Sequence, residues 1–125
     1  MVAGGNPGAL PLNNLAWLYQ QVRDPRAEAT AKRAYDLAPE VAAIADTYGW
    51  ILVEAGKASL ALPILERAAT APNASAEMRY HHAVALAKGG RPDEARASLQ
   101  KLLSLPGFPL ATEARALLKE LGDAS

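Results

Sequence analysis

The chain has 125 residues, half of them hydrophobic, and its 13 basic and 13 acidic residues give a formal net charge of zero. This balance argues against nucleic-acid binding, which normally needs a strongly basic surface. The absence of cysteine excludes disulfides, thiolate nucleophiles and cysteine-containing metal sites. No apolar run reaches the roughly 18 residues of a membrane-spanning helix, so we expect no direct membrane span.

The first 40 residues predict a leader followed by two helices. Residues 1–9 are rich in glycine and lack the basic and hydrophobic regions of a signal peptide, so we expect a flexible leader. Apolar residues at helical spacing predict the first helix, and a second helix is expected from about Pro25 to Leu37. Asp24 is the expected N-cap of that helix, with Pro25 at its first position. Together they form one helix–turn–helix unit, residues 10–40.

Two further helix pairs and a final helix follow. In the second unit, residues 41–73, Gly56 should end the first helix in a left-handed conformation. We expect Ser59 to cap the second helix of this unit and Pro63 to lie in its opening turn. The third unit spans residues 74–106, with its turn at residues 89–93. Residues 107–125 then hold a helix from about Leu110 to Leu121 whose polar face would cap the array.

Small residues recur along the chain at a spacing of 34 residues. Gly49 corresponds to Ala83 at this spacing and, with one residue fewer in the first turn, to Ala16 at a spacing of 33. The second helices repeat alanine at the same interval: Ala27, Ala61 and Ala95, and also Ala34 and Ala68. A period of 34 residues with small residues at fixed places is typical of stacked helix pairs.

These residues resemble the tetratricopeptide repeat (TPR) family over about residues 10–106. The resemblance implies an all-α, right-handed superhelical solenoid of three helix–turn–helix repeats plus a C-terminal capping helix. It also implies a non-catalytic protein–protein interaction scaffold without cofactor, which binds a protein or peptide segment in its concave groove. The alternative is a structural segment that self-associates through the apolar face of its first helix pair, either as a homodimer or within a longer solenoid.

In this family the first helix of each repeat lines the groove. The resemblance therefore implies the following partner-groove positions: Asn13, Trp17, Gln20, Gln21, Asp46, Trp50, Val53, Glu54, Glu77, Tyr80, Val84 and Lys88. Among them, Trp17, Trp50 and Tyr80 could form an aromatic strip, because Trp and Tyr often carry interface energy. The other interpretation is that both tryptophans fill space between helices.

A narrower resemblance concerns the first helices and the Gly107–Phe108–Pro109 ending. They are similar to the C-terminal repeats of TPR lipoproteins of bacterial PEP-CTERM/exosortase exopolysaccharide systems (PrsT type). This resemblance implies a role in envelope assembly and a location in the cell envelope or periplasm; without it, a cytoplasmic location is expected.

The chain shows no pattern of an active site or metal site. His81 and His82 are neighbours on a helix and point about 100° apart, so they cannot share a metal without a bend. We expect His82 to be half-buried between helices and His81 to lie on a solvated or groove edge. No serine follows a strand as in a nucleophile elbow, and the glycines near the N-terminus lack the Lys-Ser/Thr of a phosphate loop. The sequence therefore predicts no enzyme activity.

Overall fold

The computed structural model describes residues 8–122 of the chain. Within this range the chain forms helices and no strand, which confirms the all-α prediction. The seven helices are α1 (Ala9–Gln21), α2 (Ala27–Leu37), α3 (Ala42–Glu54), α4 (Ala58–Ala69), α5 (Ala76–Lys88), α6 (Pro92–Leu103) and α7 (Ala111–Gly122). The first residue of α1 belongs to the stretch expected as a leader, and residues 1–7 of that stretch lie outside the described range.

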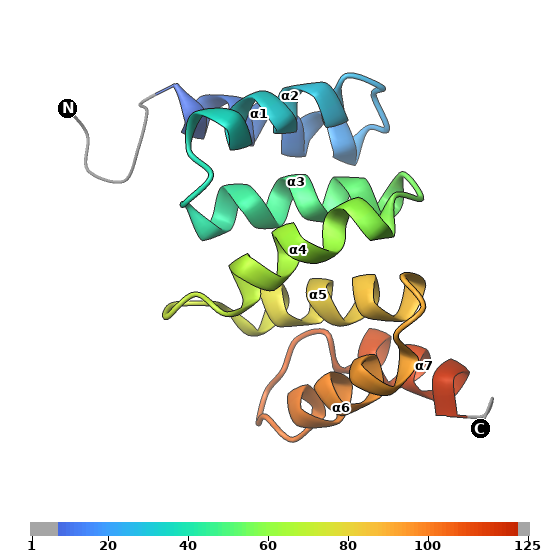
Figure 1. Cartoon of the computed structure of the whole chain (residues 1–125). Coiled ribbons are helices and arrows are strands. Elements are labelled where there is room, and N and C mark those ends of the chain that lie inside the picture. Colours follow the sequence, from blue (N-terminus) through green and yellow to red (C-terminus); the bar gives the residue numbers. More distant parts are fainter. Residues whose placement is uncertain (1–7, 123–125) are drawn as a thin grey trace.

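The helices form pairs that stack along one axis. Figure 1 shows α1 and α2 at one end, α3 and α4 in the middle, and α5 to α7 at the other end. The members of each pair pack together, and α1, α3, α5 and α7 also contact one another in that order. Within residues 8–122 no packing joins helices of units that are not neighbours. This arrangement is a helical repeat solenoid.

Small side chains lie where the two helices of a pair approach most closely. Ala16 and Ala83 are fully buried, and Gly49, which occupies the same place in the middle unit, is buried too. A Cβ atom on Gly49 would lie 2.5 Å from Cγ of Leu65, so α3 and α4 leave no space for a larger residue there. The alanines predicted to repeat in the second helices are buried as well: Ala27, Ala34, Ala61, Ala68 and Ala95.

The turns inside the pairs use a left-handed residue. Gly56 has φ +80° and Gly90 has φ +85°, which confirms the prediction for Gly56. In the first unit the corresponding residue is Arg23, with φ +58°. A residue with a side chain costs roughly 1–2 kcal/mol in this conformation, so the shortened first turn is formed at some expense in stability.

The start of α2 differs from the prediction. The helix begins at Ala27, two residues later than expected, because Pro25 and Arg26 belong to the turn. Asp24 still receives a backbone N–H: its Oδ1 accepts from the Arg26 nitrogen at 2.9 Å. The Arg26 guanidinium also donates to this carboxylate and lowers the pKa of Asp24 to about 2. The aspartate therefore closes a local turn before the helix rather than capping it from the adjacent position.

Two predictions for α4 are wrong. Ser59 is not its cap, because α4 already begins at Ala58 and no side chain caps it. Pro63 is not in the opening turn but is the sixth residue of the helix, where it offers no N–H to the Ser59 carbonyl. The helix nevertheless continues to Ala69, since Ala61 and Leu65 on either side of the proline are fully buried.

The last helix covers the end of the stack. Ala114 of α7 is buried in a cluster with Leu99, Leu102 and Phe108, and three leucines of α7 pack on this cluster. Arg96 of α6 donates from Nη1 to the Leu121 carbonyl at 2.8 Å and fixes the end of the helix. The predicted bounds of this helix are shifted by one residue at each end.

No helix among residues 8–122 combines the length and the apolar character needed to cross a membrane.

Candidate functional site

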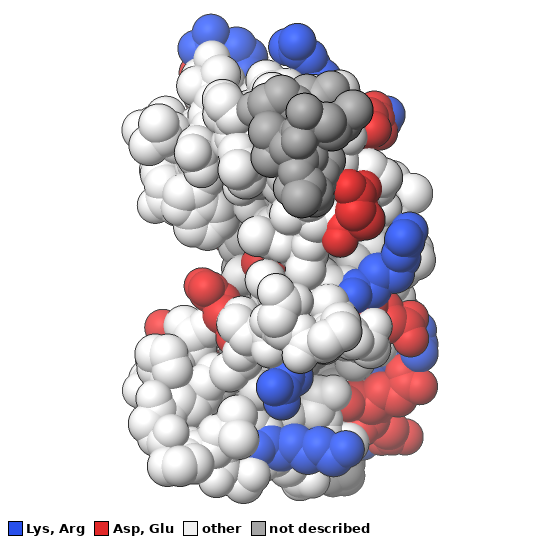
Figure 2. Space-filling view, turned by 90° about the vertical axis from the view of Figure 1, so that its left-hand side faces the viewer, with Lys and Arg blue, Asp and Glu red and all other residues white. Residues whose placement is uncertain are grey.

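Two hollows occupy the surface formed by the first helices α1, α3 and α5. The amino-end hollow, near the N-terminal halves of these helices, has a volume of about 590 Å³ and is lined by Asn13, Asn14, Trp17, Leu18, Ala43, Asp46, Thr47, Ser75, Glu77, Met78 and His81. The carboxyl-end hollow has a volume of about 810 Å³ and is lined by Trp17, Gln20, Gln21, Arg23, Trp50, Val53, Glu54, Gly56, Ala58 and Lys88. Figure 2 shows an indentation on one side of the molecule, between its upper and lower parts.

Ten of the twelve predicted groove residues line these hollows. The reason is the common orientation of the first helices, because residues spaced by the repeat occupy the same face of α1, α3 and α5. Tyr80 and Val84 line neither hollow.

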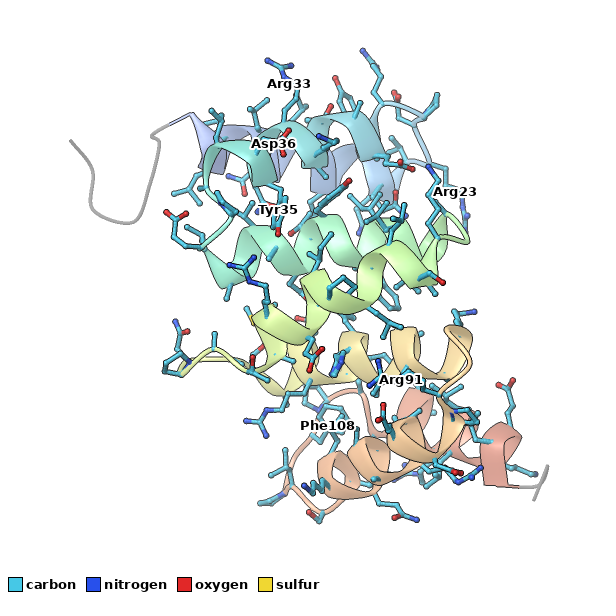
Figure 3. All side chains as sticks on the ribbon, in the orientation of Figure 1. Arg23, Arg33, Tyr35, Asp36, Arg91 and Phe108 are labelled. Atoms are coloured by element: carbon cyan, nitrogen blue, oxygen red, sulfur yellow. The ribbon has the colours of Figure 1, made fainter. Side chains whose placement is uncertain are left out.

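Tyr80 and Val84 instead belong to the interior of the third unit. Val84 is 5% exposed and lies in the central core cluster. Tyr80 is half-buried, its ring centroid lies 6.5 Å from that of Phe108, and burial raises the pKa of its hydroxyl. Phe108 reaches this place from the loop before α7 (Figure 3). The aromatic strip suggested by the sequence therefore has only its two tryptophans on the hollowed surface.

The two tryptophans differ in their surroundings. Trp17 is 38% exposed and lines both hollows, so its ring lies where they meet. Trp50 is half-buried, and its ring stacks on the His81 imidazole with centroids 4.2 Å apart and an angle of 20° between the planes. Trp17 thus offers a free aromatic surface, whereas Trp50 uses one face of its ring to join α3 to α5.

His81 is placed differently from the prediction. It is 5% exposed rather than lying on a solvated edge, and its Nδ1 lies 2.8 Å and 3.0 Å from the two carboxylate oxygens of Asp46. Asp46 is on α3 and His81 on α5, so the pair ties successive repeats together beneath the amino-end hollow. Their separation of 35 residues is one more than the repeat period, and this spacing could have indicated that they are neighbours.

His82 is half-buried, as predicted, and burial lowers its pKa below the ordinary value of 6.5. Glu66 of α4, together with Arg91 and Glu94 at the start of α6, are the charged groups around it. The imidazole of the unfolded chain therefore binds a proton at a higher pH than the folded one.

We expect the free energy of unfolding to decrease as the pH falls through about 6.5, because protonation then favours the unfolded chain. The loss of free energy of unfolding should level off once the pH is below the pKa of His82 in the folded protein. His82→Gln should remove this part of the pH dependence, which urea denaturation of both proteins between pH 8 and pH 5 would measure. Parallel pH profiles for the two proteins would contradict the assignment to His82.

The charges on the hollowed surface are unevenly distributed. The carboxyl-end hollow contains Arg23 and Lys88 beside Glu54, whose Oε1 accepts a hydrogen bond from Gln20 Nε2 at 2.7 Å across α1 and α3. The amino-end hollow contains Asp46 and Glu77 and no lysine or arginine. Within residues 8–122 no three His, Asp or Glu side chains gather closely enough to hold a metal ion.

Several lining residues were missed in the sequence. Arg23 comes from a turn, and Leu18, Ser75 and Met78 flank the groove positions of the family. Leu18 and Met78 each lie one residue from a predicted groove position, so a wider window around each position would have included them. Arg23 had no such signal, since its place depends on the left-handed turn that shortens the first unit.

Comparison with family models gives no match, and no curated protein matches either. Among solved structures, the MamA RS-1 ArsTM double mutant is similar, with a TM-score of 0.70 and 20% sequence identity over 93% of this chain and 76% of the other. MamA is a TPR-containing protein. At this identity the likeness concerns the fold alone, and it shows that this chain is a TPR-like helical repeat solenoid.

Proposed function

We propose that this chain is a non-catalytic scaffold that binds an extended segment of another protein along its hollowed surface. The observation that supports this most strongly is the position of Trp17, a partly exposed aromatic ring shared by two hollows that together involve α1, α3 and α5. Tryptophan is among the residues that contribute most to binding when a partner covers them. The two hollows on either side of the ring provide room for the flanking residues of such a segment.

Selection from a random dodecapeptide library displayed on phage tests this proposal. Synthetic copies of selected peptides are titrated against the protein, and Trp17→Ala should weaken their binding at least tenfold, the effect of losing about 1.4 kcal/mol. The matched control is Leu60→Ala, because Leu60 is 60% exposed on α4 and lines neither hollow. Failure to select any peptide, or equal losses in both variants, would contradict the proposal.

A finer proposal rests on the sequence resemblance to the PrsT-type lipoproteins. In that case the groove serves bacterial exopolysaccharide or envelope assembly. Deleting the gene in its bacterial host should lower the amount of secreted polysaccharide, and a Trp17→Ala copy should restore it less than the wild-type copy. Unchanged polysaccharide after deletion would contradict this role.

The exposed face of α1 favours self-association as a second candidate function. Leu15 and Leu18 are 38% and 61% exposed, whereas the corresponding residues of the next repeat, Tyr48 and Ile51, are 9% and 2% exposed. Tyr48 packs on Tyr35 of the preceding unit, with ring centroids 5.4 Å apart, whereas no helical unit precedes Leu15 within the described residues.

A second copy or a further repeat would bury this face. Light scattering over a concentration series tests the first case: a mass that rises towards twice that of the monomer, and returns to the monomer value in Leu18→Glu, supports a dimer. A constant monomer mass at high concentration contradicts it.

A further inference from the structure

The amino-end hollow gathers acceptors of hydrogen bonds. It contains the carboxylates of Asp46 and Glu77. Figure 2 shows acidic residues beside the indentation of the surface. Asp46 already contacts His81, but Glu77 is exposed and forms no ion pair with another described residue. Even with a positive charge on His81, this hollow keeps a net negative charge.

An unsatisfied amide adds to this pattern. The Oδ1 atom of Asn13 is buried beside the amino-end hollow and has no hydrogen-bond partner. A buried acceptor without a donor is unfavourable, and rotation of this amide towards the hollow would let an N–H group of a ligand reach it. The two carboxylates and this amide, with no lysine or arginine in the lining, favour an ammonium or guanidinium group.

The carboxyl-end hollow has the opposite balance. Arg23 and Lys88 form no ion pair within the described residues, while the carboxylate of Glu54 is held by Gln20. The lining therefore carries one more positive than negative charge. Glu77 and Lys88 stand near opposite ends of α5, eleven residues apart, which corresponds to about 16 Å along the helix axis.

We propose that the bound segment carries both charges: a lysine or arginine that enters the amino-end hollow and an aspartate or glutamate that reaches the carboxyl-end hollow. At about 3.3 Å per residue, an extended chain covers the 16 Å with about five residues, so the two charged residues should be separated by roughly four to six positions. Trp17, between the hollows, would contact an apolar residue placed between the two charges. This inference rests on the proposed function and names the chemistry of the partner.

The test repeats the dodecapeptide selection on wild-type protein and on two charge variants. Wild-type protein should select peptides with a basic and an acidic residue at the stated separation more often than the starting library contains them. Glu77→Lys should abolish the preference for the basic residue and keep that for the acidic residue, and Lys88→Glu should do the converse. In a synthetic copy of a selected peptide, replacing its basic residue by glutamine should weaken binding at least tenfold. Added salt should weaken binding of the unchanged peptide.

Glu120→Lys and Lys119→Glu are matched controls, because they make the same changes of net charge on exposed positions of α7. Their selected peptides should resemble those of the wild-type protein. If the controls change the preferences as much as the groove variants do, the inference is wrong. It is equally wrong if the selected peptides depend on Trp17 but show no pair of opposite charges, and in that case the proposed function stands. If no peptide is selected, both are overturned.

Discussion

Leu65→Ala is expected to lower the free energy of unfolding by about 2–5 kcal/mol. Leu65 is 0% exposed in the central core cluster, and the tight approach of α3 to α4 limits how far the structure can collapse into the space left by the removed atoms. Leu60→Ala on the same helix is the control: Leu60 is 60% exposed, so its truncation should change the free energy of unfolding little. Urea denaturation followed by circular dichroism measures both variants, and similar losses in the two would contradict this account of the core.

The contact between Leu65 and Gly49 allows a second test of the packing between α3 and α4. In the wild-type protein, the new Cβ of Gly49→Ala would lie 2.5 Å and 2.6 Å from Cγ and Cδ2 of Leu65, so overpacking of about 1–3 kcal/mol opposes a helix-propensity gain of about 0.5–1 kcal/mol. Leu65→Ala removes both atoms, so Gly49→Ala should be neutral or stabilising in that background. A double-mutant cycle should therefore show coupling of about 1 kcal/mol or more. Additive effects would mean that the two residues do not meet.

Ala61→Leu is expected to lower the free energy of unfolding by about 1–3 kcal/mol, because three extra carbon atoms would be forced into a filled junction. Ala61 is 0% exposed, and its counterparts Ala27 and Ala95 are 3% and 0% exposed, so the position is closed in every unit. Ala29→Leu is the matched control on an exposed helix face. Thermal unfolding measures both variants, and an unchanged or higher melting temperature for Ala61→Leu would count against the repeat alignment.

The fold was predictable because its causes recur in the sequence. Buried alanines and glycines at fixed spacing restrict which helices can approach each other, and Gly56 marks a turn by a conformation that few other residues adopt. Details set by a single local balance were not predictable. The helix was expected to continue through Pro63, as it does, but the proline was placed in the opening turn; it lies further inside, where burial of its neighbours outweighs the missing hydrogen bond.

The candidate groove was predictable in part for the same reason. Periodicity identifies the face of each first helix, and so most of the lining residues. It says nothing of what covers that face at the end of the array, where Phe108 and α7 pack around Tyr80. The Asp46–His81 pair was also missed, because a period of 34 residues relates equivalent positions, and these two residues are one position away from equivalence.

The stacking order of the helices has a consequence for exchange of backbone amides with solvent. Since α1 and α2 touch no described helix outside the middle unit apart from each other, they can open without disturbing α5, and the amides of α1 should exchange sooner than those of α3. A segment lying across Trp17 and Lys88 would bridge α1 and α5, which share no packing of their own. When the segment is bound, amide exchange should therefore be slower throughout α1, including at amides that the segment does not contact.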